Sequence, residues 1–249
     1  MHEFLQYGLI ALISFLATLI GSMSGGGSSL IATPLWLMLG FPLPVALSSN
    51  MVNGALWSIV AARTYLRGHD VDWRLIRMFI GFGLLGAFVG TKAITLGDVH
   101  VLKRIFGVCI TLVVALAYFK KDFGLNAHEP RLSRWQTSLF ALPLGFYESF
   151  FGSGNGFFTS AVLTTARGFV LLEALGYYYT IACVWCVFAS SIYVASGHYD
   201  LKLILPAICG SVLGASVGSR LGKKHGSKFV KNIFMAIGGL LGLKLLLGL

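Results

Sequence analysis

The sequence predicts an all-α integral membrane protein made of two inverted repeats, each with about five helical segments. Three observations lead to this fold class: the composition, the recurrence of long apolar stretches, and a similarity between the two halves of the chain. Of the 249 residues, 56% are hydrophobic and only 11% are charged, whereas soluble domains carry about 25% charged residues. With a mean hydropathy of +0.81, most of the surface must face hydrocarbon, which excludes an ordinary water-soluble protein.

Apolar stretches follow one another along the whole chain. They lie at 4–22, 28–40, 43–66, 73–92, 103–119, 136–152, 157–166, 169–195, 200–219 and 229–249. Alternating strand patterns of about ten residues are lacking, so helices and not a barrel are expected to span the bilayer. The second and seventh stretches are shorter than the ~20 residues that a crossing needs. Each follows a glycine cluster, and we therefore expect a short broken or re-entrant helix pair after each cluster.

The two glycine clusters belong to an internal repeat. They are Ser24–Gly27 and Ser153–Gly156, 129 residues apart. Other collinear matches have offsets of 129 or 128: Gly68-His69 with Gly197-His198, Leu85–Lys92 with Leu213–Arg220, and Leu102–Phe106 with Val230–Phe234. These matches predict a first membrane repeat at 1–122, a connecting loop at 123–132 and a second membrane repeat at 133–249.

The distribution of basic residues predicts the topology. Five segments per half give an odd number of crossings, so the second half is expected to be inverted. The loops at 63–77, 120–134, 166–170 and 220–231 then share one side and hold 14 of the 19 Lys and Arg residues, against 5 on the other side. By the positive-inside rule both termini are expected outside. The net charge of +10 is therefore interpreted as an orientation signal and not as a nucleic-acid interface.

Paired interrupted helices predict a substrate site near the membrane midplane, where the two repeats meet. Non-helical backbone persists inside a bilayer only if it is buried in protein or lines a wet cavity. The free N–H groups of the two short helices would point at that centre and favour an anion. The residues expected to bind it are Ser24, Gly25, Gly26, Gly27, Ser28, Ser153, Gly154, Asn155 and Gly156. The alternative is that these glycines only allow close helix crossing, the role we assign to Gly86/Gly90 and Gly214/Gly218.

Polar residues on the third segment of each half extend this candidate site. Asn50 and Asn53 share one helical face, and Tyr179 and Thr180 occupy the corresponding place in the second half. Hydrogen bonding between helices is an equally good reading of these residues. Trp57 and Trp185, 128 residues apart, would either wall the cavity or pack in the core.

Glu148 is the acidic residue that lies well inside an apolar run. A carboxylate within the membrane is costly and therefore suggests a function. It is a candidate for carrying a proton and coupling transport to the proton gradient. The alternative is a structural acid that binds backbone groups of the broken helix.

Three motifs resemble those of a known family. They are Gly21–Pro34, which contains Ser24-Gly25-Gly26-Gly27, then Pro44–Asn50 and Tyr65–Trp73. The chain is similar to the sulfite exporter TauE/SafE family of membrane permeases, with a degraded copy of the first motif in the second half, where Asn155 replaces the central glycine. The resemblance implies transport of sulfite, sulfonates or sulfoacetate across the bacterial inner membrane, which would make both termini periplasmic.

The function expected is secondary transport of a small anion by alternating access, and the alternative is an anion-selective channel that uses the same amides as a filter. No enzyme is expected, because paired carboxylates, a Ser-His-Asp set and an HExxH motif are lacking.

We expect neither a cofactor nor a metal, because the cysteines lie in apolar runs and suit packing. The expected partners are the anion and the lipid bilayer, and a homo-oligomer stays open. The cysteines are Cys109, Cys183, Cys186 and Cys209.

Overall fold

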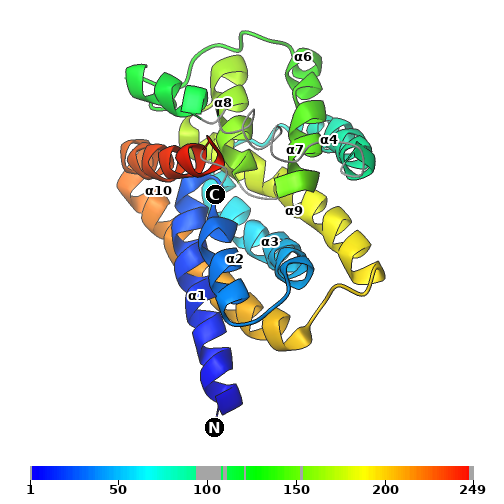
Figure 1. Ribbon diagram of the computed structural model, residues 1–249. Helices are drawn as coiled ribbons and strands as arrows, with labels where there is room; N and C mark the ends of the chain where they lie inside the picture. The colour runs from blue at the N-terminus through cyan, green and yellow to red at the C-terminus, as the bar shows by residue number, and fades with distance from the viewer. Residues whose placement is uncertain (1, 94–107, 109–110, 121, 152–153, 247–249) are drawn as a thin grey trace.

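The structure, a computed structural model, describes residues 2–93, 108, 111–120, 122–151 and 154–246 and is built from helices (Figure 1). The first half contains α1 (His2–Ser24), α2 (Ser28–Met38), α3 (Leu43–Leu66) and α4 (Trp73–Ala93). The second half contains α6 (Arg134–Leu139), α7 (Ala141–Phe151), α8 (Asn155–Arg167), α9 (Leu171–Ala195) and α10 (Leu201–Leu246). Four helices, α1, α3, α9 and α10, are long and apolar enough to cross a membrane among the described residues. The all-α membrane class is confirmed.

Two predicted segments have a different form in the structure. The stretch expected at 136–152 is divided into α6 and α7, because the Pro143 ring in the first turn of α7 is incompatible with the carbonyl of residue 139 in a continuous helix. The basic segment expected at 220–231 is itself helical. Only Gly226, with φ 80° and ψ 178°, interrupts α10 there and turns its second part aside. Of the stretch expected at 103–119, residues 111–119 are helical, and 103–107, 109 and 110 lie outside the described residues.

Helices of the first half pack on helices of the second half. In Figure 1, α1 runs along α10, while α4 packs on α7 and α3 on α9. Each of these three contacts therefore joins a helix of the first half to a helix of the second half. Glycines allow both contacts: a Cβ on Gly214 would lie 2.3 Å from the carbonyl oxygen of Phe15, and one on Gly86 would lie 2.0 Å from that of Leu142. The packing role predicted for these two glycines is therefore the one they have.

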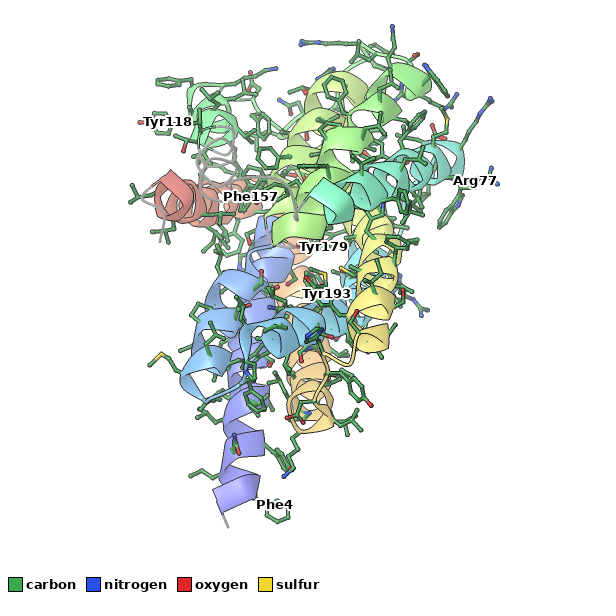
Figure 2. The ribbon with its side chains drawn as sticks, turned by 45° about the vertical axis from the view of Figure 1, so that its right-hand side comes forward. Phe4, Arg77, Tyr118, Phe157, Tyr179 and Tyr193 are labelled. Atoms are coloured by element: carbon green, nitrogen blue, oxygen red, sulfur yellow. The ribbon has the colours of Figure 1, made fainter. Side chains whose placement is uncertain are left out.

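The largest core cluster lies where α3, α8, α9 and the second part of α10 meet. Phe157 and Tyr179 are fully buried in it, whereas Phe4 is 82% exposed at the far end of α1 (Figure 2). Large apolar side chains are exposed on the outer helix faces, among them Leu12 and Leu112. Such faces suit a bilayer and not water.

The four basic segments, 63–77, 120–134, 166–170 and 220–231, contact one another at one end of the molecule. The N-terminus lies at the other end (Figure 1). The contacts are the Asp72–Arg134 ion pair, the bond from the Arg131 amide to the Ala166 carbonyl, and bonds from Lys223 Nζ to the Arg67 carbonyl and from Lys231 Nζ to the Lys120 carbonyl. The side of the membrane that this end faces stays a prediction from the charge count.

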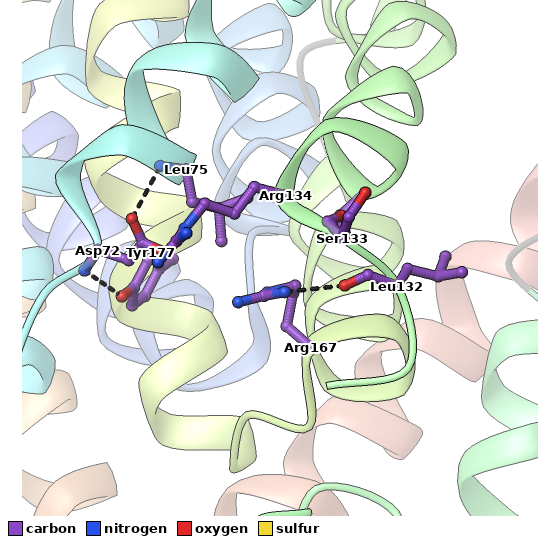
Figure 3. A network of polar contacts seen from close by, with 8 residues as sticks. Asp72, Leu75, Leu132, Ser133, Arg134, Arg167 and Tyr177 are labelled. Carbon is purple, nitrogen blue, oxygen red and sulfur yellow. Dashed lines mark hydrogen bonds and ion pairs between the residues drawn. The ribbon is translucent and has the colours of Figure 1, made fainter. Parts of the chain in front are cut away.

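Asp72 is the centre of a polar network that joins the halves at this end (Figure 3). Its carboxylate accepts a 2.5 Å bond from Arg134 Nε and a 3.1 Å bond from the Leu75 amide, and its own amide donates to the Tyr177 hydroxyl at 2.6 Å. Burial raises the pKa of Asp72, but the bonds from Arg134 and Leu75 and the charge of Arg134 lower it further than burial raises it. The pKa therefore lies below its ordinary value.

Candidate functional site between two glycine turns

The first glycine turn joins α1 to α2. Gly25, Gly26 and Gly27 have φ values of 80°, 107° and 97°, in the left-handed region that other residues seldom adopt. The Gly26 amide closes the end of α1 by donating to the Gly21 carbonyl at 3.1 Å. The buried Ser24 hydroxyl donates to the Gly26 carbonyl at 2.6 Å. Ser24 therefore holds the turn together instead of offering its hydroxyl hydrogen to a ligand.

The second glycine turn, before α8, lies directly against the first. Gly154 has φ 81°, and Ser153, which the sequence also places in the site, lies outside the described residues. A Cβ on Gly156 would lie 1.7 Å from the Gly25 carbonyl oxygen, and a Cβ on Gly26 would lie 3.3 Å from the Gly154 nitrogen. Segments about 130 residues apart in sequence thus meet backbone to backbone.

Both short helices begin with uncapped amides. The N-cap residues of α2 and α8 are Gly27 and Gly154, and neither helix start has a side-chain cap bond. The first N–H groups of a helix have no partner inside it, and they carry the positive end of the helix dipole. The two helix starts therefore present donors to whatever lies beside the turns.

A cavity of about 20 Å³ lies beside the turns. Residues that the sequence predicts for the site form part of its wall: Gly26, Gly27, Ser28, Asn50, Glu148 and, as one of two alternatives, Trp57. The wall also contains residues that the site prediction leaves out: Ser29, Met51, Gly54, Ser58, Tyr178, Ala182 and Cys186. A cavity of this volume holds about one water molecule. A tetrahedral anion requires more room than this cavity offers.

Glu148 reaches the cavity from α7 and is only 3% exposed. Its Oε2 accepts a 2.7 Å hydrogen bond from Asn155 Nδ2, and the same amide nitrogen donates to the Leu144 carbonyl at 3.2 Å. Asn155 Oδ1 is buried without a hydrogen-bond partner in the described part of the chain. Asn155, which replaces a glycine in the second motif, therefore positions the buried carboxyl group of Glu148 with its amide nitrogen. Its amide oxygen stays available as a hydrogen-bond acceptor.

The two asparagines of α3 have different surroundings. Asn50 lines the cavity and donates to Thr33 Oγ1 at 2.5 Å, which ties α3 to α2. Asn53 is 2% exposed and does not line this cavity. Neither of its amide atoms has a partner within the described residues. Of the pair, Asn50 alone is placed to contact a ligand in this conformation.

The two predicted residues of α9 do not line the cavity. The Tyr179 hydroxyl donates to the carbonyls of Gly21 and Ser22, at 2.8 and 3.0 Å, and so fixes the end of α1. Thr180 faces a second cavity of about 720 Å³, between α3 and α9. The neighbouring Tyr178 lines the small cavity instead, because residues at 178, 182 and 186 share one face of α9. The tyrosine run marks this region, but only the packing of α9 selects which tyrosine lines the cavity.

The two tryptophans take different roles, although they occupy equivalent places in the predicted repeat. Trp57 lines the cavity and packs edge-on against Tyr179, with ring centroids 5.2 Å apart. Trp185 packs on Gly83 of α4, and its Nε1 donates to the Ile80 carbonyl at 3.4 Å. Both alternatives considered for this pair therefore occur, one in each half.

A membrane protein in which two interrupted helix pairs meet around a small polar cavity belongs, as a class, with the transport proteins of the bilayer. The profile of the family described as sulfite exporter TauE/SafE matches residues 10–245. The chain belongs to the TauE/SafE family.

Bacterial relatives match over nearly the full length of both chains. A probable membrane transporter protein of Haemophilus influenzae is 26% identical, over 94% of this chain and 91% of the relative. One from Sinorhizobium is 28% identical, over 97% and 94%, and YfcA of Escherichia coli, also a probable membrane transporter protein, is 25% identical, over 97% and 90%. No solved structure matches the chain. The relatives are named as transporters, and the chain is a multi-pass membrane protein of a transporter family.

Proposed function

We propose that the protein is a secondary transporter of small sulfur-containing anions, such as sulfite, a sulfonate or sulfoacetate, and that it binds them between the two glycine turns. The observation that carries this proposal is the contact of the turns beside a cavity, with the uncapped starts of α2 and α8 in the same place. Tetrahedral oxyanions suit two sets of backbone amides from opposite sides. The family description supports a sulfur anion.

The mechanism proposed is alternating access, with one half rocking against the other. The small volume of the cavity supports this choice over a channel, because a continuous pore through the turns would need more space. Trp57 of α3, which lines the small cavity, is in aromatic contact with Tyr179 of α9, and in the proposed mechanism this contact separates the glycine turns from the wider cavity between α3 and α9. Movement of α3 relative to α9 would join the two spaces.

The wider cavity provides the electrostatic approach for the anion. Arg63 and Arg67 line this cavity together with Thr180. Thr180, which the sequence predicts as a binding residue, would therefore contact the anion on its way to the site and not in the site itself. Cations in a cleft with low-dielectric walls raise the local concentration of anions. By the charge count this opening would face the cytoplasm of a bacterium with the protein in its inner membrane, and both termini would be periplasmic.

Glu148 is the proposed proton carrier of the cycle. It lines the cavity and is held by Asn155, so protonation changes the charge beside the anion and the hydrogen bonding at the start of α8. A proton on Glu148 would remove the repulsion between its carboxylate and a bound anion. The repeats proposed for the rocking motion are 1–122 and 133–249, joined by 123–132.

Two measurements on purified protein test the proposal. In a thermal-shift panel of sulfite, sulfate, sulfonates and carboxylates, the substrate is expected to stabilise the protein in proportion to its binding. In proteoliposomes, the same anion is expected to show saturable counterflow against labelled substrate. Conductance without saturation would support the channel instead, and the lack of any effect by sulfur anions would contradict the proposal.

A further inference from the structure

A groove of about 1090 Å³ at the basic end is separate from the proposed substrate site. It lies between the end of α3 and the part of α10 that precedes Gly226. Five cationic side chains line it, two from α3 or its end and three from α10: Arg63, Arg67, Arg220, Lys223 and Lys224. The wall contains no acidic residue, and among the described residues none of these five cations forms an ion pair. Within the described part of the chain, no carboxylate pairs with the cations of this groove.

One of these cations also fixes the shape of the groove. Lys223 Nζ donates to the carbonyls of Thr64 and Arg67, at 3.0 and 2.7 Å. The carbonyls at the C-terminal end of a helix such as α3 have no hydrogen-bond partner within the helix. This lysine holds α10 against α3. Arg220 and Lys224, which lie beside it on α10, are exposed. Among the described residues, Lys223 and neither of these two makes the hydrogen bonds to the end of α3.

The apolar residues that line the groove belong to α3. Ile59 and Val60 of α3 lie one to two turns from the arginines, and Ile59 is 53% exposed on the outer face of a membrane-spanning helix. Cations beside an apolar strip between two spanning helices match the two parts of a phospholipid, an anionic headgroup and an acyl chain.

We propose that this groove binds an anionic phospholipid, with its phosphodiester group held by Arg63, Arg67, Arg220 and Lys224 and one acyl chain along Ile59 and Val60. The lipid would bridge α3 and α10, which belong to different halves of the chain. The groove shares Ile59, Arg63 and Arg67 with the cavity between α3 and α9, whereas Arg220 and Lys224 line the groove alone. The lipid site is therefore tested at these two residues of α10.

The test counts phosphatidylglycerol bound to the detergent-solubilised protein by native mass spectrometry. The groove variant is Arg220→Gln/Lys224→Gln, which leaves Lys223 in place. Its control is Arg74→Gln/Arg77→Gln, which removes the same charge from α4, where Figure 2 shows Arg77 at the outer edge of the molecule. Each basic residue near an anionic surface contributes about 1 kcal/mol, a factor of about five. We expect the groove variant to bind the lipid at least about tenfold more weakly and the control to bind it as the wild type does.

Three other outcomes would overturn the proposal: an unchanged affinity in the groove variant, an equal loss in both variants, or binding of inorganic phosphate as strong as that of the lipid. The last would identify a site for free anions. If the double variant does not fold, the single variants Arg220→Gln and Lys224→Gln are each expected to lose about fivefold. Since the assay measures lipid and not transport, it gives its answer whether or not the sulfur-anion proposal holds.

Discussion

The carbonyl oxygen of Gly25 lies 1.7 Å from the point that a Cβ on Gly156 would occupy. The two turns that carry the candidate site therefore touch through backbone atoms, and only glycine fits at position 156. A flexible side chain could move aside, but the opposing turn is held by three glycines in the left-handed region and by Ser24.

Gly156→Ala is expected to force the two turns apart. The substitution should cost about 1–3 kcal/mol of stability, the usual penalty for overpacking, and should abolish saturable transport. Thermal unfolding and proteoliposome counterflow measure the two effects. Gly8→Ala in α1 is the matched control, because a Cβ there has no neighbour within 4 Å. Normal transport by Gly156→Ala would contradict the placement of the substrate between the turns.

The neighbouring tyrosines of α9 are expected to separate stability from binding. Tyr179→Phe removes hydrogen bonds to the carbonyls of Gly21 and Ser22. Each carbonyl keeps at least one other donor, so the expected loss is about 1 kcal/mol of stability. Tyr178→Phe changes the cavity wall and should alter the apparent affinity for the anion with little change in thermal midpoint. If Tyr178→Phe lowered the stability and Tyr179→Phe altered the affinity, the assignment of Tyr178 to the cavity wall would be wrong.

Glu148→Gln is expected to uncouple transport from the proton gradient. The amide keeps the shape of the side chain but cannot carry a proton, so counterflow should persist while uptake driven by a pH gradient is lost. Uptake at several external pH values in proteoliposomes measures this. Glu173→Gln is the control, since Glu173 lies in the first turn of α9 and does not line the cavity. Retention of the wild-type pH dependence by Glu148→Gln would leave the acid with a structural role only.

The Asp72–Arg134 pair is expected to make a small, pH-dependent contribution to stability. Because the pKa of Asp72 is lowered in the folded protein, its stabilisation is present above the ordinary carboxyl pKa and is lost as the pH falls through the folded value. The Arg134 side chain is half exposed, so water screens the pair and its contribution to stability should be small.

Asp72→Asn tests this, since asparagine still caps α4 by accepting from the Leu75 amide. Its thermal midpoint should be lower than that of the wild type near pH 7 at low salt. The difference should narrow below about pH 4 and in high salt. Asp70→Asn, which removes an exposed charge two residues earlier, should show neither trend. A difference that is constant with pH would exclude the ion pair as its cause.

Much of the architecture is predictable from the sequence because it depends on local patterns. The length of an apolar stretch determines whether a helix can span the bilayer, and glycine clusters determine where a helix stops. The division of 136–152 into α6 and α7 was predictable too, because Pro143 is visible in the sequence, yet hydropathy alone does not register it. Gly226 is less visible, since a single glycine in a basic helix often stays helical.

The sequence by itself was sufficient to predict the membrane class, the resemblance to the family, the positions of the two glycine turns and an acidic residue, Glu148, within an apolar segment. Each of these depends on composition or on residues close together in the chain. The sequence also predicts that the two turns meet, whereas the tertiary structure shows that they touch backbone to backbone, that Tyr178 and not Tyr179 lines the cavity, and that Arg63 and Arg220 line one groove. These relationships depend on the rotation and crossing of helices from different halves. Packing fixes that geometry through many weak contacts, and no single stretch of sequence contains it.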